Sequence, residues 1–316
     1  MHVPGLNGAQ IYLRLAPKIA AMNTISLYCK SFSTDLKRVI RLAESVARHN
    51  KSQIEFFISV PQKELKLFQN HLRHLPAILL ADEEIIAANS SIRSSEFSNL
   101  PGHLGQQIVK SEFWRINPSK TYLCLDSDSV FIRDFEPGDY ITSEGVPYTV
   151  LTEAHDLQFD ALTRGKNQIL ENFQREAASI QQLFEREGRA YSFGPMPMVW
   201  HRDVWESLED AYLKPRHLNF MDAIHLAPLE SRWYGEALLK FQAIPLLPCE
   251  PFFKVYHYAW QLDQDRRRGL HQEQLARLYS GIIYQSSWER SMDWPYEGGS
   301  RWSRMARLVR RKLGKM

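Results

Sequence analysis

The sequence Tyr122-Leu-Cys-Leu-Asp-Ser-Asp-Ser-Val-Phe131 joins an apolar segment to two aspartates that are one residue apart. In a β-strand, residues i and i+2 lie on the same face, so Asp126 and Asp128 can direct both carboxylates to one point where the strand ends. Two carboxylates this close repel each other unless a divalent cation lies between them or one of them is protonated. The pattern therefore predicts a metal and phosphate site at the carboxyl end of a sheet.

Two other interpretations of this stretch stay open. A strand that ends in an Asx-type turn would use the same residues, because Asp and Ser are common in turns. The stretch also resembles the motif with which phosphatases of the haloacid-dehalogenase type present an aspartate nucleophile, which would here be Asp126. Those enzymes need a further acidic pair in a Gly-Asp loop. Gly138-Asp139 follows the motif too closely for that role, and no later Gly-Asp occurs.

Four further segments flank the Asp-x-Asp stretch in a fixed order. Upstream lies Pro101-Gly-His-Leu-Gly-Gln-Gln-Ile-Val-Lys110, whose apolar spacing predicts a helix with Gln106 and Lys110 on one face and Gln107 beside them. Downstream are Pro195-Met-Pro-Met198, Leu229-Glu-Ser-Arg-Trp-Tyr-Gly235 and Phe252-Phe-Lys-Val-Tyr-His257. In this order the segments resemble a group of bacterial glycosyltransferase-like proteins of the GT-A superfamily, over roughly residues 24 to 260. In the third segment Leu229 and Ser231 depart from that pattern, whereas Glu230, Tyr234 and Gly235 match it.

The resemblance implies a nucleotide-sugar donor, expected to be UDP-linked, and a divalent ion, Mn²⁺ or Mg²⁺. It implies that Asp128 binds the ion directly and that Asp126 contacts the donor ribose or a metal-bound water. A histidine from late in the domain would complete the metal set of Asp126, Asp128 and His257. A histidine that only makes hydrogen bonds in the core or at the surface is the alternative for His257.

Glu230 is the expected general base, which would take the proton of the acceptor hydroxyl in an inverting transfer. The alternative is that Glu230 only caps the N-terminus of a helix, where a negative charge stabilises the helix by about 0.3–1 kcal/mol. Asp126 is the other catalytic candidate. The residues expected to bind the nucleotide sugar are Lys30, Ser31, Asp35, Gln106, Gln107, Lys110, Asp126 and Ser127. For Lys30, Ser31 and Asp35, which follow the first predicted strand, the alternative is that this segment only caps a helix through Ser33, Thr34 or Asp35.

Strand and helix patterns alternate along the chain. Strands are predicted at 25–29, 55–60 and 77–80, with helices at 35–49 and 62–72 between them. This alternation predicts an α/β fold with a mostly parallel sheet flanked by helices, which in GT-A proteins is Rossmann-like. We expect an N-terminal extension without assigned function (1–21), a GT-A glycosyltransferase domain (22–260) and a C-terminal helical segment with a basic amphipathic tail (261–316). Residues 156–190 are polar and predicted to be a helical excursion over the active site.

Composition and charge narrow the cellular setting. The three cysteines lack metal-ligand spacing, which indicates a reducing compartment. No apolar run approaches the ~20 residues of a membrane span, and residues 1–21 lack the apolar core of a secretory signal. Residues 301–316 contain seven Lys or Arg and no acid, with an apolar stripe formed by Trp302, Met305, Val309 and Leu313. They are typical of a helix on an anionic membrane surface; a solvated terminus and a nucleic-acid-binding tail are the alternatives.

The sequence thus predicts a metal-dependent, hexosyltransferase-type glycosyltransferase acting on a glycan or glycolipid acceptor. The resemblance suggests bacterial surface polysaccharide or lipopolysaccharide synthesis, and we expect a cytoplasmic enzyme that is peripheral on the inner face of the membrane and does not bind nucleic acid. The alternatives are a phosphohydrolase with Asp126 as nucleophile and a non-catalytic module that binds nucleotide sugars.

Overall fold

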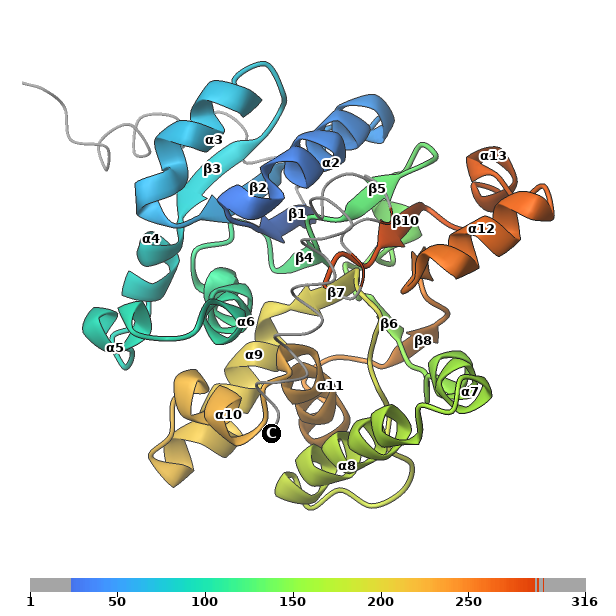
Figure 1. The fold of residues 1–316 in the computed structure, drawn as a ribbon. Helices are drawn as coiled ribbons and strands as arrows, with labels where there is room; N and C mark the ends of the chain where they lie inside the picture. Colours follow the sequence, from blue (N-terminus) through green and yellow to red (C-terminus); the bar gives the residue numbers. More distant parts are fainter. Residues whose placement is uncertain (1–23, 288, 290–291, 293–316) are drawn as a thin grey trace, which may run out of the picture.

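The centre of the molecule is a five-stranded sheet with the strand order β3-β2-β1-β4-β7 (Figure 1). The computed structural model describes residues 24–287, 289 and 292. Four strands are parallel, namely β1 (Ile25–Lys30), β2 (Phe56–Val60), β3 (Ile78–Ala81) and β4 (Thr121–Leu125). The edge strand β7 (Met198–His201) is antiparallel to β4. The predicted α/β fold with a mostly parallel sheet is therefore confirmed.

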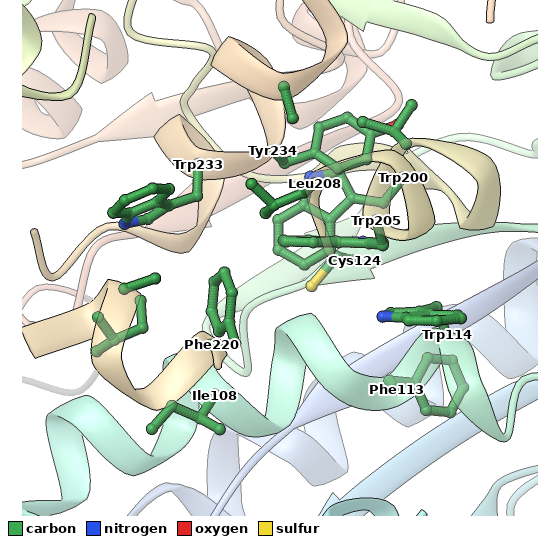
Figure 2. Packing of buried hydrophobic residues seen from close by; sticks show 14 of the residues in the cluster. Ile108, Phe113, Trp114, Cys124, Trp200, Trp205, Leu208, Phe220, Trp233 and Tyr234 are labelled. Atoms are coloured by element: carbon green, nitrogen blue, oxygen red, sulfur yellow. The ribbon is translucent and has the colours of Figure 1, made fainter. Parts of the chain in front are cut away.

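Helices cover both faces of this sheet, which is why every residue of β1 is buried. One face packs against α2 (Leu36–His49) and α3 (Leu65–Leu72). The other face packs against a larger group of helices, and Figure 2 shows buried side chains of this core, among them Trp205, Phe220 and Trp233. That group is α4 (Asp82–Ala87), α6 (Gly102–Glu112), α9 (Arg202–Leu208), α10 (Phe220–Leu226) and α11 (Glu230–Phe241), with the short α5 (Ser94–Ser98) beside it.

A second, three-stranded sheet with the order β5-β10-β9 continues from the end of β4. Its strands are β5 (Ser129–Phe131), β9 (Phe253–Tyr256) and β10 (Gly281–Tyr284). The segment 261–316 was predicted to be helical, and the described part does contain most of α12 (Ala259–Arg267) and all of α13 (Gln272–Leu275). It also contains β10, which was not predicted and which lies between β5 and β9. Residues 1–21 and 301–316 lie outside the described residues.

The polar excursion forms two helices, α7 (His155–Thr163) and α8 (Asn167–Leu183). It leaves the body after β6 (Tyr148–Val150), which pairs with β8 (Leu247–Cys249). No helix in the described part of the chain is long and apolar enough to cross a membrane. Short helical turns complete the fold at Ser33–Asp35, Gln62–Glu64, Phe113–Arg115, Pro137–Asp139, Glu209–Leu213 and Lys214–Arg216.

One close contact fixes α11 against the loop that follows α8. A Cβ atom built on Gly235 would overlap the ring of Phe193, so only glycine allows the ring to pack against the helix at this position. The contact explains on packing grounds why the Tyr-Gly pair at the end of the Leu229–Gly235 segment carries a glycine.

Candidate active site

The order of the strands marks one position in the central sheet. From β1 the chain adds β2 and then β3 on one side, and it later adds β4 on the other side of β1. Strand order therefore reverses between β1 and β4, and ligands of open α/β sheets bind in the crevice outside the carboxyl ends of such strands. Lys30 ends β1 and Asp126 directly follows β4, so both lie at the carboxyl ends of these two strands.

The two aspartates do not lie on one continuous strand, as the sequence had suggested. β4 ends at Leu125, and the backbone N–H of Ser129 donates to the carbonyl oxygen of Asp126 at 3.0 Å. Asp126 and Asp128 thus occupy a tight turn between the central sheet and the second sheet. The chain must turn here because β4 pairs with β1 and β7, whereas β5 pairs with β10. The turn-forming character of Asp and Ser describes the backbone correctly, and the two carboxylates remain close neighbours.

Asp128 is buried, with 3% of its surface exposed. Burial, and then the negative charge of Asp126, raise the pKa of Asp128 to about 7. Its Oδ2 accepts a hydrogen bond of 2.7 Å from the backbone N–H of Ser286. Its Oδ1 is buried and has no hydrogen-bond partner among the described residues. An orphaned carboxylate oxygen beside a second carboxylate fits a hard divalent cation, because Mg²⁺ is commonly held by one or two carboxylates plus substrate phosphates and waters.

Lys110 of α6 joins the aspartate turn to the start of α11. Its Nζ lies 2.6 Å from Oδ1 of Asp126 and 3.3 Å from Oε1 of Glu230. The lysine side chain is only 6% exposed. Burial opposes its charge, but the carboxylates of Asp126 and Glu230 outweigh burial and raise the pKa of Lys110 well above its ordinary value. Lys110 is therefore a permanent cation between two anions.

Glu230 is the first residue of α11 and is buried. Its backbone N–H donates to Oε1 of Gln107 at 3.2 Å, so α6 supplies both a cap for the helix and a cation for the carboxylate. Gln107, Lys110, Asp126 and Glu230 are thus brought together from α6, the aspartate turn and α11. All four are among the residues singled out in the sequence.

The end of β1 forms a second polar group beside this one. Nζ of Lys30 lies 2.9 Å from Oδ2 of Asp82, a buried residue at the start of α4. Burial raises the pKa of Asp82 to about 6. The Oγ of Ser31 is buried and has no hydrogen-bond partner among the described residues. Asp35 is also buried, and its charge adds to those that raise the pKa of Asp128, which places it near the aspartate turn.

Residues 16–260 match the model of a protein family described as "Family of unknown function (DUF6492)". The chain belongs to this family. No curated protein matches the sequence. Similar solved structures include mouse xyloside xylosyltransferase 1 in its apo form, with 9% identity, 84% of this chain and 98% of that chain covered, and a TM-score of 0.43. They also include the apo bifunctional glycosyltransferase WbbM (10% identity, 85% and 47% covered, TM-score 0.46). A third is the galactosyltransferase LgtC with donor and acceptor sugar analogs (10% identity, 82% and 86% covered, TM-score 0.43).

In this family member His257 lies at the end of the second sheet. It follows β9, and its backbone N–H donates to Oε1 of Gln261 at 2.7 Å. Burial lowers the pKa of its imidazole to about 4. Among the described residues no three His, Cys, Asp or Glu side chains are grouped so that they could hold a metal ion. The assignment of His257 to a metal set with Asp126 and Asp128 therefore stays a prediction.

Two other predicted positions lie in the same two elements. Gln106 is partly exposed on α6, and Ser127 is buried in the aspartate turn. Sequence reasoning missed Asp82 and Ser286. Asp82 directly follows a short apolar strand, which is a usable signal for a residue at a sheet edge. Ser286 acts through its backbone N–H, so no side-chain pattern could have revealed it.

Proposed function

We propose that this protein is a GT-A-type glycosyltransferase that moves a sugar from a nucleotide donor, UDP-linked in the first instance, to a glycan or glycolipid acceptor. The observation that carries the proposal is the linked group of Asp128, Asp126, Lys110 and Glu230 at the point where strand order reverses. The order of the sequence motifs supports it, since three of them contribute to this one group.

Asp128 and Asp126 would hold a divalent ion, Mg²⁺ or Mn²⁺, whose remaining ligands are the donor phosphates and water. When bound, the ion supplies positive charge to the departing nucleoside diphosphate. The unpartnered Oδ1 of Asp128 is the oxygen that this proposal assigns to the ion. The two aspartates carry this part of the proposal, and His257 stays a prediction for a third ligand.

Glu230 is the group that would take the proton of the acceptor hydroxyl. A general base has to be ionised and held in place. Nζ of Lys110 lies 3.3 Å from the Glu230 carboxylate and helps to hold it in place, and Gln107 fixes the first residue of the helix. Because Lys110 also contacts Asp126, it links the base to the donor side of the site and adds a positive charge close to the expected phosphates.

The cellular setting is also part of the proposal. Residues 301–316 have the composition of an interfacial segment, which supports an acceptor on a membrane surface, in the lipopolysaccharide or surface-polysaccharide class. The test is sedimentation with anionic and neutral liposomes at low and high salt. Binding that is confined to anionic liposomes and is weakened by salt supports a location on the inner face of the membrane. Equal binding to both lipids, or to neither, refutes it.

The central test is thermal unfolding with UDP, with and without Mn²⁺, followed by hydrolysis of a panel of nucleotide sugars. We expect UDP to raise the melting temperature only when Mn²⁺ is present, because only the folded state binds the pair. Asp128→Ala should lose this shift and abolish turnover. The matched control is Asp263→Ala, since Asp263 is an exposed aspartate of α12 with 58% of its side chain accessible. Retention of turnover by Asp128→Ala refutes the proposal.

The phosphohydrolase alternative has one observation in its favour, which is that Lys110 contacts the carboxylate of Asp126. A phosphatase with Asp126 as nucleophile would form an aspartyl phosphate that is labile to acid or hydroxylamine. Trapping such an intermediate with a phosphomonoester would replace the transferase proposal.

A further inference from the structure

The segment that follows α13 reaches the aspartate turn. The backbone N–H of Tyr284, the last residue of β10, donates to the carbonyl oxygen of Asp128 at 3.2 Å. Two residues later the N–H of Ser286 donates to Oδ2 of the same aspartate at 2.7 Å. These residues lie beyond residue 260, where the family match ends. The segment thus holds both the backbone and the side chain of Asp128.

The bond from Ser286 has a directional effect on the carboxylate. A carboxylate can rotate about its terminal bond unless one of its oxygens is held. Here Oδ2 is held by a short bond to a buried residue, since Ser286 is 8% exposed. Oδ1 is then left in a defined direction, and it has no partner among the described residues. The N–H of Ser286 therefore selects which oxygen of Asp128 is available and where it points.

The donor is itself held rigidly. A Cβ atom on Gly281 would overlap the ring of Phe253 on one side and the carbonyl oxygen of Val130 on the other. Position 281 of β10 therefore has no room for a side chain between the ring of Phe253 and the backbone of Val130. After Tyr284, the N–H of Gln285 donates to the carbonyl oxygen of Tyr256 at 2.9 Å, which extends the pairing with β9 to the residue before Ser286. A shift of Ser286 would require this whole strand to move.

We propose that the backbone N–H of Ser286 is a positioning group of the donor site, which aims Oδ1 of Asp128 at the divalent ion. The proposal rests on the proposed function, because it assigns the free oxygen to the metal that a nucleotide-sugar donor brings. Hydrogen bonds to metal ligands typically change metal affinity or activity by roughly 10- to 100-fold when they are removed. The C-terminal strand is then a working part of the site in addition to closing the second sheet.

Two proline variants separate this role from simple strand pairing. Ser286→Pro removes the N–H that contacts Asp128, whereas Gln285→Pro removes the neighbouring N–H that contacts only Tyr256. Ser286→Ala keeps the backbone N–H and serves as the side-chain control. Each full-length variant is titrated with Mn²⁺ in the presence of UDP, with free Mn²⁺ measured by electron paramagnetic resonance, and its melting temperature is recorded.

The expected pattern is specific. Ser286→Pro should weaken Mn²⁺ binding by roughly 10- to 100-fold, while Ser286→Ala binds Mn²⁺ as the wild type does. Gln285→Pro should lower the melting temperature and leave Mn²⁺ affinity within a few-fold of wild type. If Ser286→Pro binds Mn²⁺ as tightly as Ser286→Ala, or if both proline variants lose affinity equally, the positioning role is refuted.

Two further measurements keep the outcome interpretable. Asp128→Ala gives the baseline of the proposed function: if wild type and Asp128→Ala bind Mn²⁺ alike, the metal site itself is refuted, independently of Ser286. If Ser286→Pro does not fold, amide hydrogen exchange of the wild type decides. The Ser286 amide should be protected, and should exchange more slowly still with Mn²⁺ and UDP bound. Exchange as fast as in an unstructured peptide, or exchange that Mn²⁺ and UDP do not slow, overturns the proposal.

Discussion

Replacing Lys110 with methionine tests the centre of the site most directly, because the change removes one cation from between two buried or half-buried carboxylates. At an effective dielectric constant of about 20, its contact of 2.6 Å with Asp126 corresponds to about 6 kcal/mol of attraction. The contact of 3.3 Å with Glu230 corresponds to about 5 kcal/mol. The cost of removing the ammonium group from water offsets most of this sum. Losses of about 3–5 kcal/mol are typical when one partner of a buried pair is removed, and we expect a loss of that size.

The assay is urea unfolding of wild type and Lys110→Met at pH 8. Lys120→Met is the control, since Lys120 is 67% exposed and lies 3.7 Å from Asp203. It should cost less than about 1 kcal/mol. A loss below about 1 kcal/mol for Lys110→Met would show that the lysine does not hold the two carboxylates together.

Three further changes give separate readouts. Glu230→Gln should lower kcat by roughly 10²- to 10⁴-fold with little change in donor affinity, and a loss of stability without a loss of rate would leave Glu230 as a helix cap only. Burial lowers the pKa of His257 to about 4. As the pH falls, the imidazole is therefore protonated in the unfolded chain before it is protonated in the folded one. The free energy of unfolding then decreases between about pH 6.5 and pH 4. His257→Gln should remove about 3 kcal/mol of that fall in urea titrations across this range; an unchanged profile contradicts it. Gly235→Ala should cost about 1–3 kcal/mol through overlap with the ring of Phe193, whereas Gly102→Ala, which meets nothing within 4 Å, should be neutral or stabilising in thermal unfolding.

The regular elements of the first half were predictable because their patterns are local. The strand predicted at 25–29 is β1 (Ile25–Lys30), and the helix predicted at 35–49 is α2 (Leu36–His49), whose apolar residues face one side. The break between β4 and β5 was missed, since both strands are apolar and only their pairing partners differ. β10 was missed because four buried residues after two short helices carry too little periodicity to be recognised.

The site was predictable as a set of residues but not as a set of contacts. Lys110 and Glu230 were each named from motifs, yet their pairing depends on how α6 and α11 approach the same sheet edge. The bond from Ser286 to Asp128 is of a different kind, because any residue except proline supplies a backbone N–H. A contact of that type depends on the path of the whole chain and leaves no signature in composition or spacing.

The bond between Ser286 and Asp128 joins positions 158 residues apart, and this span has a consequence for synthesis of the protein. At ribosomal rates of about 5–20 residues per second, roughly 8–30 s pass between the addition of Asp128 and that of Ser286. During that interval β5 lacks β10, the strand with which it pairs, and Asp128 lacks the donor that orients it. Closing so long a loop is also entropically slow relative to local folding. A nascent or prematurely terminated chain can therefore complete the earlier strands of the central sheet while Asp128 still lacks its bond to Ser286. Under the proposed function, donor binding would begin only once β10 and Ser286 have left the ribosome.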